Sequence, residues 1–471
     1  MHCNVPCNAA SGHDRGRAPR PASPGRSTDD RPARPRRGPS RRSDRRDSVP
    51  RVPEIRSTVA PNGLPVHRIA LPGTRTLTAL VAFDAGARTE RPDENGIAHF
   101  LEHLVFKGGE IYDDYRKVNE TAERMGGVLN AYTSHSLVAF HITVRAESAE
   151  PALDLLTDFA GRPHVDADEL DKERGVVIQE IARYHDQPAA LAEMLVDEAT
   201  FGDHPLGRPV LGPEEHLRTF TRDQVLAFRD RRWSGRTGGA FLVGDVGSLP
   251  DDDRLHELFA RFPDVAPDGP ADPVPAARTE VVVQERDTNQ SHLRFTYRPD
   301  LDASDPAVRS ALTIYGTLLG GSMGSRLFDE IREQRGLAYS VSASAWSIGD
   351  ALQLQLSAGL DSSKCLEAYA RMREIVAELH EDGPTEEEVE RARAYAAGRL
   401  VLAFENSGAV ARHAATQAIV HGQSLDPDDA IAGLDAVTFD AVREVAARVD
   451  PDAAAVACVG PHAAGDFGWS R

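Results

Sequence analysis

The sequence predicts an α+β protein built from two related lobes, each a mostly antiparallel sheet packed with helices. Two observations predict this class. Strand patterns and helix patterns interleave along the chain, and a helical segment near residue 166 is echoed 219 residues later. The length agrees, because 471 residues exceed one ordinary domain. No apolar run reaches the roughly 18 residues that a membrane-spanning helix needs, so we expect no membrane span.

The first half begins with two short strands on either side of the turn signal Pro61-Asn62-Gly63. Apolar spacing then predicts a strand, two helices and a β stretch, at 77–83, 96–106, 113–125 and 128–144. Three further helices are predicted at 149–159, 166–184 and 188–201. Because strands and helices alternate without a strict βαβ order, the pattern favours the α+β class.

A proline-rich linker separates the two halves. Five prolines lie between Phe262 and Arg278, which indicates an extended segment. The helix-start pattern at Asp166–Arg174 recurs at Thr385–Arg393, and a repeat this long predicts duplication of a whole domain. We therefore expect four segments: a tail at 1–50, a zinc-binding lobe at 51–262, a linker at 263–276 and a second lobe at 277–471.

Charge is divided unevenly along the chain. Residues 1–50 hold 12 Arg and five Asp, a charge of +7, so the rest of a chain of total charge −19 carries −26. The tail is rich in Pro, Ser and Arg and is predicted to be disordered. It has no apolar run typical of a secretory signal. A passive extension is the favoured interpretation, while a mitochondrial transit peptide is disfavoured by the acidic residues and prolines.

Composition also limits the partners and the compartment. The acidic body argues against nucleic acid as the main partner, because phosphate neutralisation needs a basic surface. The four cysteines are too few and too scattered for a disulfide framework, and their spacing does not predict a Cys-rich zinc site. This use of cysteine indicates a reducing compartment, so we expect a cytoplasmic protein. The four are Cys3, Cys7, Cys365 and Cys458.

The strongest motif is the run from His99 to His103, His-Phe-Leu-Glu-His. In a helix, positions i, i+3 and i+4 share one face, so His99, Glu102 and His103 project together. Two imidazoles one turn apart can bind one Zn²⁺ and leave a carboxylate beside it to handle a proton. The alternative is a surface helix with unrelated histidines.

A catalytic zinc needs a third protein ligand from another element. The predicted helix 166–184 offers Glu173 and Glu180, seven residues apart and therefore on one face. Its apolar stripe gives it a reason to be buried, and buried carboxylates are costly unless they are paired or bound to a metal. The alternative is a pair of solvated glutamates.

These residues resemble the inverted zinc-binding motif of the pitrilysin-like metallopeptidases, which places a glutamate 77 residues after the second histidine and another seven before it. The resemblance runs from about Val52 to Gly460 and includes the segment 204–212. It implies one Zn²⁺ per chain, a general base next to the metal and a supporting carboxylate at its periphery. In this sequence the implied zinc ligands are His99, His103 and Glu180, the base is Glu102 and the supporting residue is Glu173.

The second half also carries a resemblance. In the segment 327–340, Arg332 and Tyr339 are spaced like the family pair that reaches the substrate. A Tyr hydroxyl can hydrogen-bond an oxyanion, and an Arg can hold peptide carbonyls. From the residues alone, the favoured interpretation is a solvated helix residue for Arg332 and a core strand residue for Tyr339.

The stretch Asn130-Ala131-Tyr132-Thr133 resembles the edge strand that pairs with substrate in this family. Tyr132 is then expected to line a side-chain pocket, with a half-buried strand aromatic as the alternative. In the duplicated lobe Ala392 and Arg399 stand where the first lobe has Glu173 and Glu180, and no second His-x-x-Glu-His occurs. One zinc per chain therefore follows from the duplication.

The resemblance implies a zinc metalloendopeptidase that hydrolyses extended or unfolded peptides in a chamber. Small two-lobed members close that chamber with two chains, and both the zinc motif and the Arg332/Tyr339 pair occur here in one chain. This favours a homodimer over a heterodimer with a related subunit. Two alternatives remain: a non-catalytic structural subunit, and a processing enzyme that depends on a partner.

Overall fold

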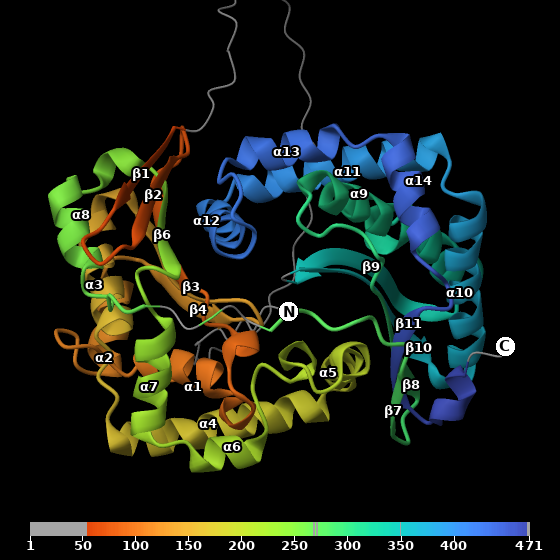
Figure 1. Ribbon diagram of the computed structural model, residues 1–471, viewed down its shortest axis with the longest axis horizontal. Coiled ribbons are helices and arrows are strands. Elements are labelled where there is room, and N and C mark those ends of the chain that lie inside the picture. The colour runs from red at the N-terminus through yellow and green to blue at the C-terminus, as the bar shows by residue number, and fades with distance from the viewer. Residues whose placement is uncertain (1–53, 267–268, 270–271, 349, 469–471) are drawn as a thin grey trace, which may run out of the picture. The chain divides into compact units, whose positions relative to one another are not determined.

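Two mixed sheets organise the chain in the computed structural model, which describes residues 54–266, 269, 272–348 and 350–468 (Figure 1). The predicted tail at 1–50 lies outside the described residues. Each sheet has helices packed against it, so the predicted α+β class with two lobes is confirmed. None of the helices in the described part of the chain has the length and apolar character to cross a membrane.

The first sheet has six strands in the order β1-β2-β6-β3-β5-β4. All neighbours are antiparallel except β2 and β6. The predicted β stretch 128–144 is a hairpin, because Ser134 N donates to Leu137 O at 2.9 Å and closes a turn between β4 and β5. The strands are β1 Ile55–Val59, β2 Pro65–Ala70, β3 Thr76–Phe83, β4 Val128–Thr133, β5 Val138–Arg145 and β6 Gly238–Gly244.

Eight helices belong to this half of the described chain, and several pack their apolar faces against the sheet. Phe100, Phe140, Phe159 and Trp233 lie fully buried in the core that they share. The helices are α1 Ile97–Val105, α2 Tyr115–Arg124, α3 Ala149–Gly161, α4 Ala167–Asp186, α5 Pro188–Phe201, α6 Glu214–Thr219, α7 Arg222–Arg232 and α8 Asp252–Phe259.

The second sheet has five strands in the order β7-β11-β8-β10-β9, with β7 and β11 parallel. Its strands are β7 Val281–Glu285, β8 Gln290–Tyr297, β9 Ala338–Ile348, β10 Ala351–Asp361 and β11 Ala454–Gly460. The helices are α9 Pro306–Gly316, α10 Cys365–Asp382, α11 Glu386–Phe404, α12 Ser407–Thr416, α13 Pro427–Asp435 and α14 Phe439–Arg448. Short π-helical turns cover Thr317–Gly321, Phe328–Gln334 and Gln417–His421.

The two halves repeat each other locally. Helices α4 and α11 begin after Asp166 and Thr385, 219 positions apart, and both side chains accept hydrogen bonds from backbone amides of the first turn. Each sheet also contains one parallel pair that includes its last strand. These likenesses agree with a duplicated domain, while the boundaries at 262 and 277 stay predictions.

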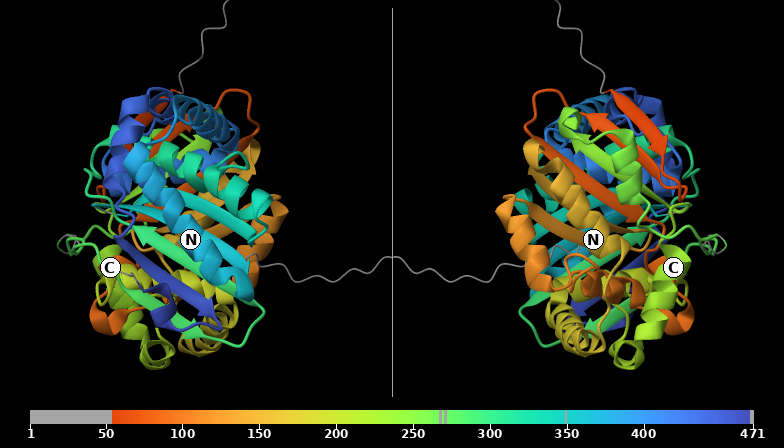
Figure 2. Two further views of the ribbon diagram at one scale, coloured as in Figure 1. Left: turned by 90° about the vertical axis from the view of Figure 1, so that its right-hand side faces the viewer. Right: turned by 90° about the vertical axis from the view of Figure 1, so that its left-hand side faces the viewer.

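Each half contributes one helix that packs on the sheet of the other half. Helix α12 packs on β3 and β6 of the first sheet, and α5 packs on β8 and β11 of the second (Figures 1 and 2). Ser407 Oγ lies 2.8 Å from Thr78 Oγ1, and Val410 joins Leu80 in a shared core. On the other side Arg294 Nε donates to Glu193 Oε2 at 3.0 Å. Each sheet is therefore covered in part by the opposite half.

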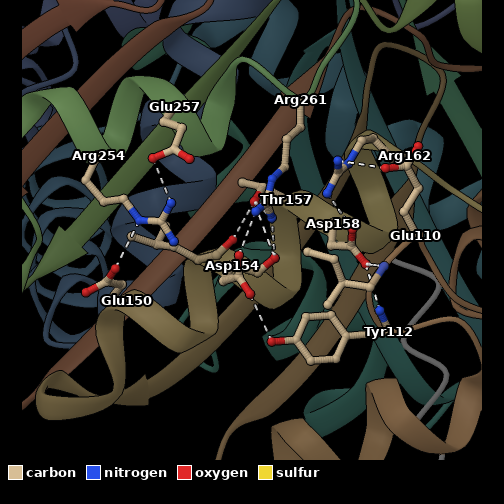
Figure 3. Close-up of polar contacts among 12 residues, drawn as sticks. Glu110, Tyr112, Glu150, Asp154, Thr157, Asp158, Arg162, Arg254, Glu257 and Arg261 are labelled. Carbon is tan, nitrogen blue, oxygen red and sulfur yellow. Dashed lines mark hydrogen bonds and ion pairs between the residues drawn. The ribbon is translucent and has the colours of Figure 1, made fainter.

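A polar network on α3 holds the segment that follows α1 (Figure 3). The fully buried Asp158 carboxylate accepts hydrogen bonds from the amides of Ile111 and Tyr112, at 2.9 and 3.0 Å, and from Arg162 at 2.9 Å. The Tyr112 hydroxyl donates to Asp154 at 3.0 Å. These bonds connect the segment after α1, the helix that carries the His-Phe-Leu-Glu-His motif, to α3.

We expect Asp158→Ala to lower the free energy of unfolding by about 3 kcal/mol, because it removes a charged acceptor and leaves backbone amides without a partner. Chemical denaturation followed by circular dichroism measures this loss. Asp113→Ala is the matched control, since Asp113 is exposed and its ion pair with Lys117 is surrounded by solvent. Equal midpoints for the two variants would contradict the structural role of Asp158.

Candidate metal centre

Helix α1 presents His99, Glu102 and His103 on its inner face. His99 is 1% exposed and Glu102 is 7% exposed, so the alternative of a surface helix with unrelated histidines is wrong. Phe100 and Leu101 are fully buried on the adjoining faces and anchor the helix in the core of the first lobe. The helix therefore holds the three polar side chains in a fixed, buried position.

The start of α1 is held by Glu90, which sequence reasoning missed. Its carboxylate accepts hydrogen bonds from Gly96 N at 3.0 Å, Ala98 N at 2.8 Å and the Asn95 side chain at 3.0 Å. A carboxylate is favourable there because the first amides of a helix have no intrahelical partner. An acidic residue several positions before a helix is a weak signal, since nothing local shows that the chain folds back.

Gly96 allows α1 to begin where it does. Its φ of 99° is in the left-handed region, and a Cβ would lie 2.7 Å from Leu211 O and 2.9 Å from Gly212 Cα. The Asn95 side chain also donates to Pro209 O at 3.0 Å. The segment 204–212, noted in the sequence for its resemblance, thus packs against the start of the motif helix.

Helix α4 brings Glu173 and Glu180 to the same place, and both are buried. Glu180 Oε2 lies 3.9 Å from His99 Nε2 and 3.4 Å from His103 Nε2. The alternative of two solvated glutamates is therefore wrong. The donor atoms of His99, His103 and Glu180 lie within 4.8 Å of one another. Tetrahedral zinc with ligands at 2.0–2.1 Å places them about 3.4 Å apart, so this donor set fits the metal.

Glu173 contacts the cluster from outside. Its Oε1 lies 2.8 Å from His103 Nδ1, the ring nitrogen opposite the one that faces Glu180. Its other oxygen pairs with Lys107, a residue just after α1 that sequence reasoning did not single out. A carboxylate on the second nitrogen orients a ligating imidazole and raises its basicity. Glu173 is therefore placed to orient His103.

Glu102 stands beside the donor set and is held by a second element. The Thr133 hydroxyl, at the end of β4, donates to Glu102 Oε2. Sequence reasoning named the stretch that contains Thr133 but assigned this residue no role. The contact joins positions 31 residues apart, so no local pattern announces it.

Burial and hydrogen bonding shift the pKa values of the clustered side chains in opposite directions. Burial raises the pKa of Glu102 to about 7 and lowers the pKa of His99 to about 3. Burial works to lower the pKa of His103 too, but hydrogen bonds to Glu173 and Glu180 outweigh it and raise that pKa to about 10. For Glu173 and Glu180, burial is outweighed by the bond to His103, and their pKa values are lowered. Glu173 and Glu180 are therefore kept ionised, whereas the pKa of the Glu102 carboxyl lies at about 7.

The residues predicted to touch substrate lie on elements that carry none of the three donor residues. Asn130, Ala131 and Tyr132 lie on β4, which is the edge strand of the first sheet. Tyr132 is buried and lines a cavity of about 490 Å³. Arg332 and Tyr339 lie in the second lobe, and no bond from either to the metal ligands is found in the described residues.

The exposure of Arg332 and Tyr339 tests the alternatives of a solvated helix residue and a core strand residue. Tyr339 lies at the start of β9, an edge strand, and is 82% exposed, so the alternative of a core strand residue is wrong. Arg332 stacks over the Phe328 ring at 4.8 Å and its side chain is 45% exposed. The counterparts of the glutamates, Ala392 and Arg399, lie on α11 and offer no metal ligand.

Comparison with known proteins identifies the family of this chain. The model of Insulinase (Peptidase family M16) matches residues 66–214, and the model of the Peptidase M16 inactive domain matches residues 219–395. The uncharacterized zinc protease YmxG of Bacillus subtilis is 30% identical over 409 residues, covering 86% of this chain and 98% of that protein. An uncharacterized zinc protease of Streptomyces coelicolor is 30% identical over 419 residues, covering 86% and 90%.

Two solved structures share the fold. A peptidase M16 inactive domain from Pseudomonas fluorescens superposes with a TM-score of 0.80 at 18% identity and covers 87% of this chain and 98% of that one. A protease from Helicobacter pylori superposes with a TM-score of 0.76 at 20% identity and covers 87% and 100%. Family models over both halves, and relatives 30% identical over nearly their whole length, show that this chain belongs to the M16 peptidase family.

Proposed function

We propose that the protein is a zinc metalloendopeptidase, with His99, His103 and Glu180 as the ligands of one zinc ion in the first lobe. The observation that carries the proposal is the meeting of these three donor atoms within 4.8 Å while Glu102 stays beside them and outside the donor set. A bound zinc ion would displace the proton of His103, and two neutral imidazoles with one carboxylate would leave the divalent ion with net positive charge. A zinc ion bound there supplies a Lewis acid that polarises a water molecule and the scissile carbonyl.

Glu102 takes the proton from the attacking water and passes it to the leaving amine. A base works best when its pKa lies near the working pH, and burial places the pKa of Glu102 at about 7. Thr133 donates to one carboxylate oxygen, which fixes the orientation of the other. Glu173 holds His103 through Nδ1 and thereby positions the ligand.

The edge strand β4 offers a binding mode for extended peptides. Among the residues that the structure describes, no strand pairs with its outer side, so a peptide in extended form can pair there through main-chain hydrogen bonds. Thr133 ends this strand and contacts Glu102, so pairing at Asn130 and Ala131 leads a substrate towards the base. Arg332 and Tyr339 are proposed to contact the same peptide from the second lobe, the Tyr hydroxyl as a donor to the oxyanion.

The proposal also includes an oligomeric state and a cellular compartment. A homodimer is proposed because one chain carries both the zinc cluster and the Arg332/Tyr339 pair, with a heterodimer with a related subunit as the alternative. The cytoplasm stays the proposed compartment. A non-catalytic structural subunit is the competing function, and the complete cluster of His99, Glu102, His103 and Glu180 counts against it.

Peptide cleavage tests the proposal. The full chain is incubated with a library of quenched unfolded peptides, before and after treatment with a zinc chelator and after return of zinc. We expect internal cleavage that the chelator abolishes and zinc restores. Zinc-loaded protein of known oligomeric state that cleaves no peptide would instead favour the structural subunit.

A further inference from the structure

A second group of side chains that could hold a metal ion lies in the second lobe, on elements that carry none of the residues of the first cluster. The donor atoms of Cys365, Cys458 and His462 lie within 4.8 Å of one another. Cys365 is the first residue of α10, Cys458 is in the interior strand β11, and His462 follows that strand. The two cysteines are 93 positions apart, which is why their sequence spacing did not predict a metal site.

The surroundings favour a bound ion. Both thiols are fully buried, and His462 is half-buried. The two cysteines are free and form no disulfide with each other. The Ser291 hydroxyl on β8 lies 2.8 Å from His462 Nε2.

Further hydrogen bonds hold the imidazole in place. The Ser291 hydroxyl donates to Ser362 Oγ at 3.0 Å, and Ser362 donates to Thr288 O at 2.8 Å. A chain of this kind fixes the ring orientation of a ligating histidine. The group therefore has two features of a prepared metal site: Cys365 and Cys458 lie on regular elements, and hydrogen bonds hold His462 in place.

We propose that Cys365, Cys458 and His462 bind a second zinc ion, independently of the catalytic centre. Zinc is bound at about 2.3 Å by thiolates and about 2.0–2.1 Å by imidazole, so tetrahedral sulfurs lie about 3.8 Å apart, which the cluster accommodates. Two thiolates neutralise the divalent charge, so the ion can be buried at low cost. The ion joins the start of α10 to β11 and the segment after it, and its role is to stabilise the second lobe.

Cobalt substitution tests this proposal with a readout that the catalytic centre cannot produce. The full chain carries Cys3→Ser and Cys7→Ser, so that Cys365 and Cys458 are the only thiols left. Metal-free, reduced protein is titrated with Co²⁺, and reduction is checked by thiol counting in denaturant. We expect the near-ultraviolet absorption of a cobalt–thiolate bond, which a site of two histidines and a carboxylate lacks.

Matched variants separate the two centres. His103→Ala is expected to keep the thiolate absorption, and Cys458→Ser to lose it. His462→Gln, at a half-buried position that tolerates the change, is expected to weaken Co²⁺ binding at least about tenfold. Zinc analysis is expected to give about two ions per chain for the parent and about one for either His103→Ala or Cys458→Ser. Zinc should also raise the thermal midpoint of the His103→Ala protein.

Three results would overturn the proposal. One is a folded, reduced parent that binds Co²⁺ without thiolate absorption, which would leave the cysteines as apolar core residues. Another is a His462→Gln variant with unchanged affinity. The third is a pair of thiols that oxidises to a disulfide and cannot be kept reduced in the folded chain, which would make the group a cross-link and not a metal site.

Discussion

Glu102→Gln should lower kcat/KM for peptide hydrolysis by about 10²–10⁴ while the protein keeps its catalytic zinc. The amide cannot accept the proton of the attacking water, yet it preserves the size of the side chain. It also retains an oxygen that can accept the Thr133 hydrogen bond. Because Glu102 is outside the donor set, zinc content should stay unchanged. Steady-state kinetics on a quenched peptide and metal analysis of the same sample measure both effects.

Glu123→Gln is the matched control for this change, since Glu123 is an exposed glutamate of α2. It should leave both rate and zinc content at the parent values. Hydrolysis by the Glu102→Gln protein within a factor of three or so of the parent would remove Glu102 from the proposed role of base, because such a small loss lies far below the usual contribution of a general base.

His103→Ala should abolish peptide hydrolysis and remove one zinc ion per chain. His103 is the residue through which the cluster is connected: Nε2 faces Glu180 at 3.4 Å and Nδ1 faces Glu173 at 2.8 Å. Its loss leaves two buried carboxylates whose pKa values the imidazole had lowered, and only two proposed ligands for the ion. Metal analysis after dialysis and a peptide assay with added zinc measure the result.

His164→Ala serves as the control, because His164 is an exposed histidine of the same lobe. Circular dichroism establishes that each variant is folded before its zinc is counted. A folded His103→Ala protein that holds as much zinc as the control would show that the catalytic ion is bound elsewhere.

The candidate centre could be predicted as far as its residues lie on regular helices. His99, Glu102 and His103 fall on one face through spacing alone, and the seven-residue step from Glu173 to Glu180 predicts a common face of α4. Knowing that these two faces meet required the family resemblance, because spacing on one helix says nothing of the helix it packs against. The edge position predicted for Asn130–Thr133 also came from that resemblance, and the sheet order confirms it.

The residues that hold the centre in place could not be predicted. Glu90, Lys107 and Thr133 act through contacts that depend on how the chain folds back, and each is an ordinary polar residue in its local sequence. Cys365 and Cys458 illustrate the same limit over a longer distance, because no periodicity relates a helix start to a strand 93 positions later. A sequence pattern shows which residues share one face of a helix or strand. The contacts of these residues depend instead on which faces pack together in the folded chain.

Helix α5 connects the zinc cluster to the opposite lobe. Helix α4 ends at Asp186, a single residue separates it from α5, and Glu180 lies only seven positions before that junction at Gln187. Since α5 is docked on β8 and β11, rotation of the second lobe must pull on the helix that carries a proposed metal ligand. A displacement of the second lobe would therefore reach Glu180 through this one joint between α4 and α5.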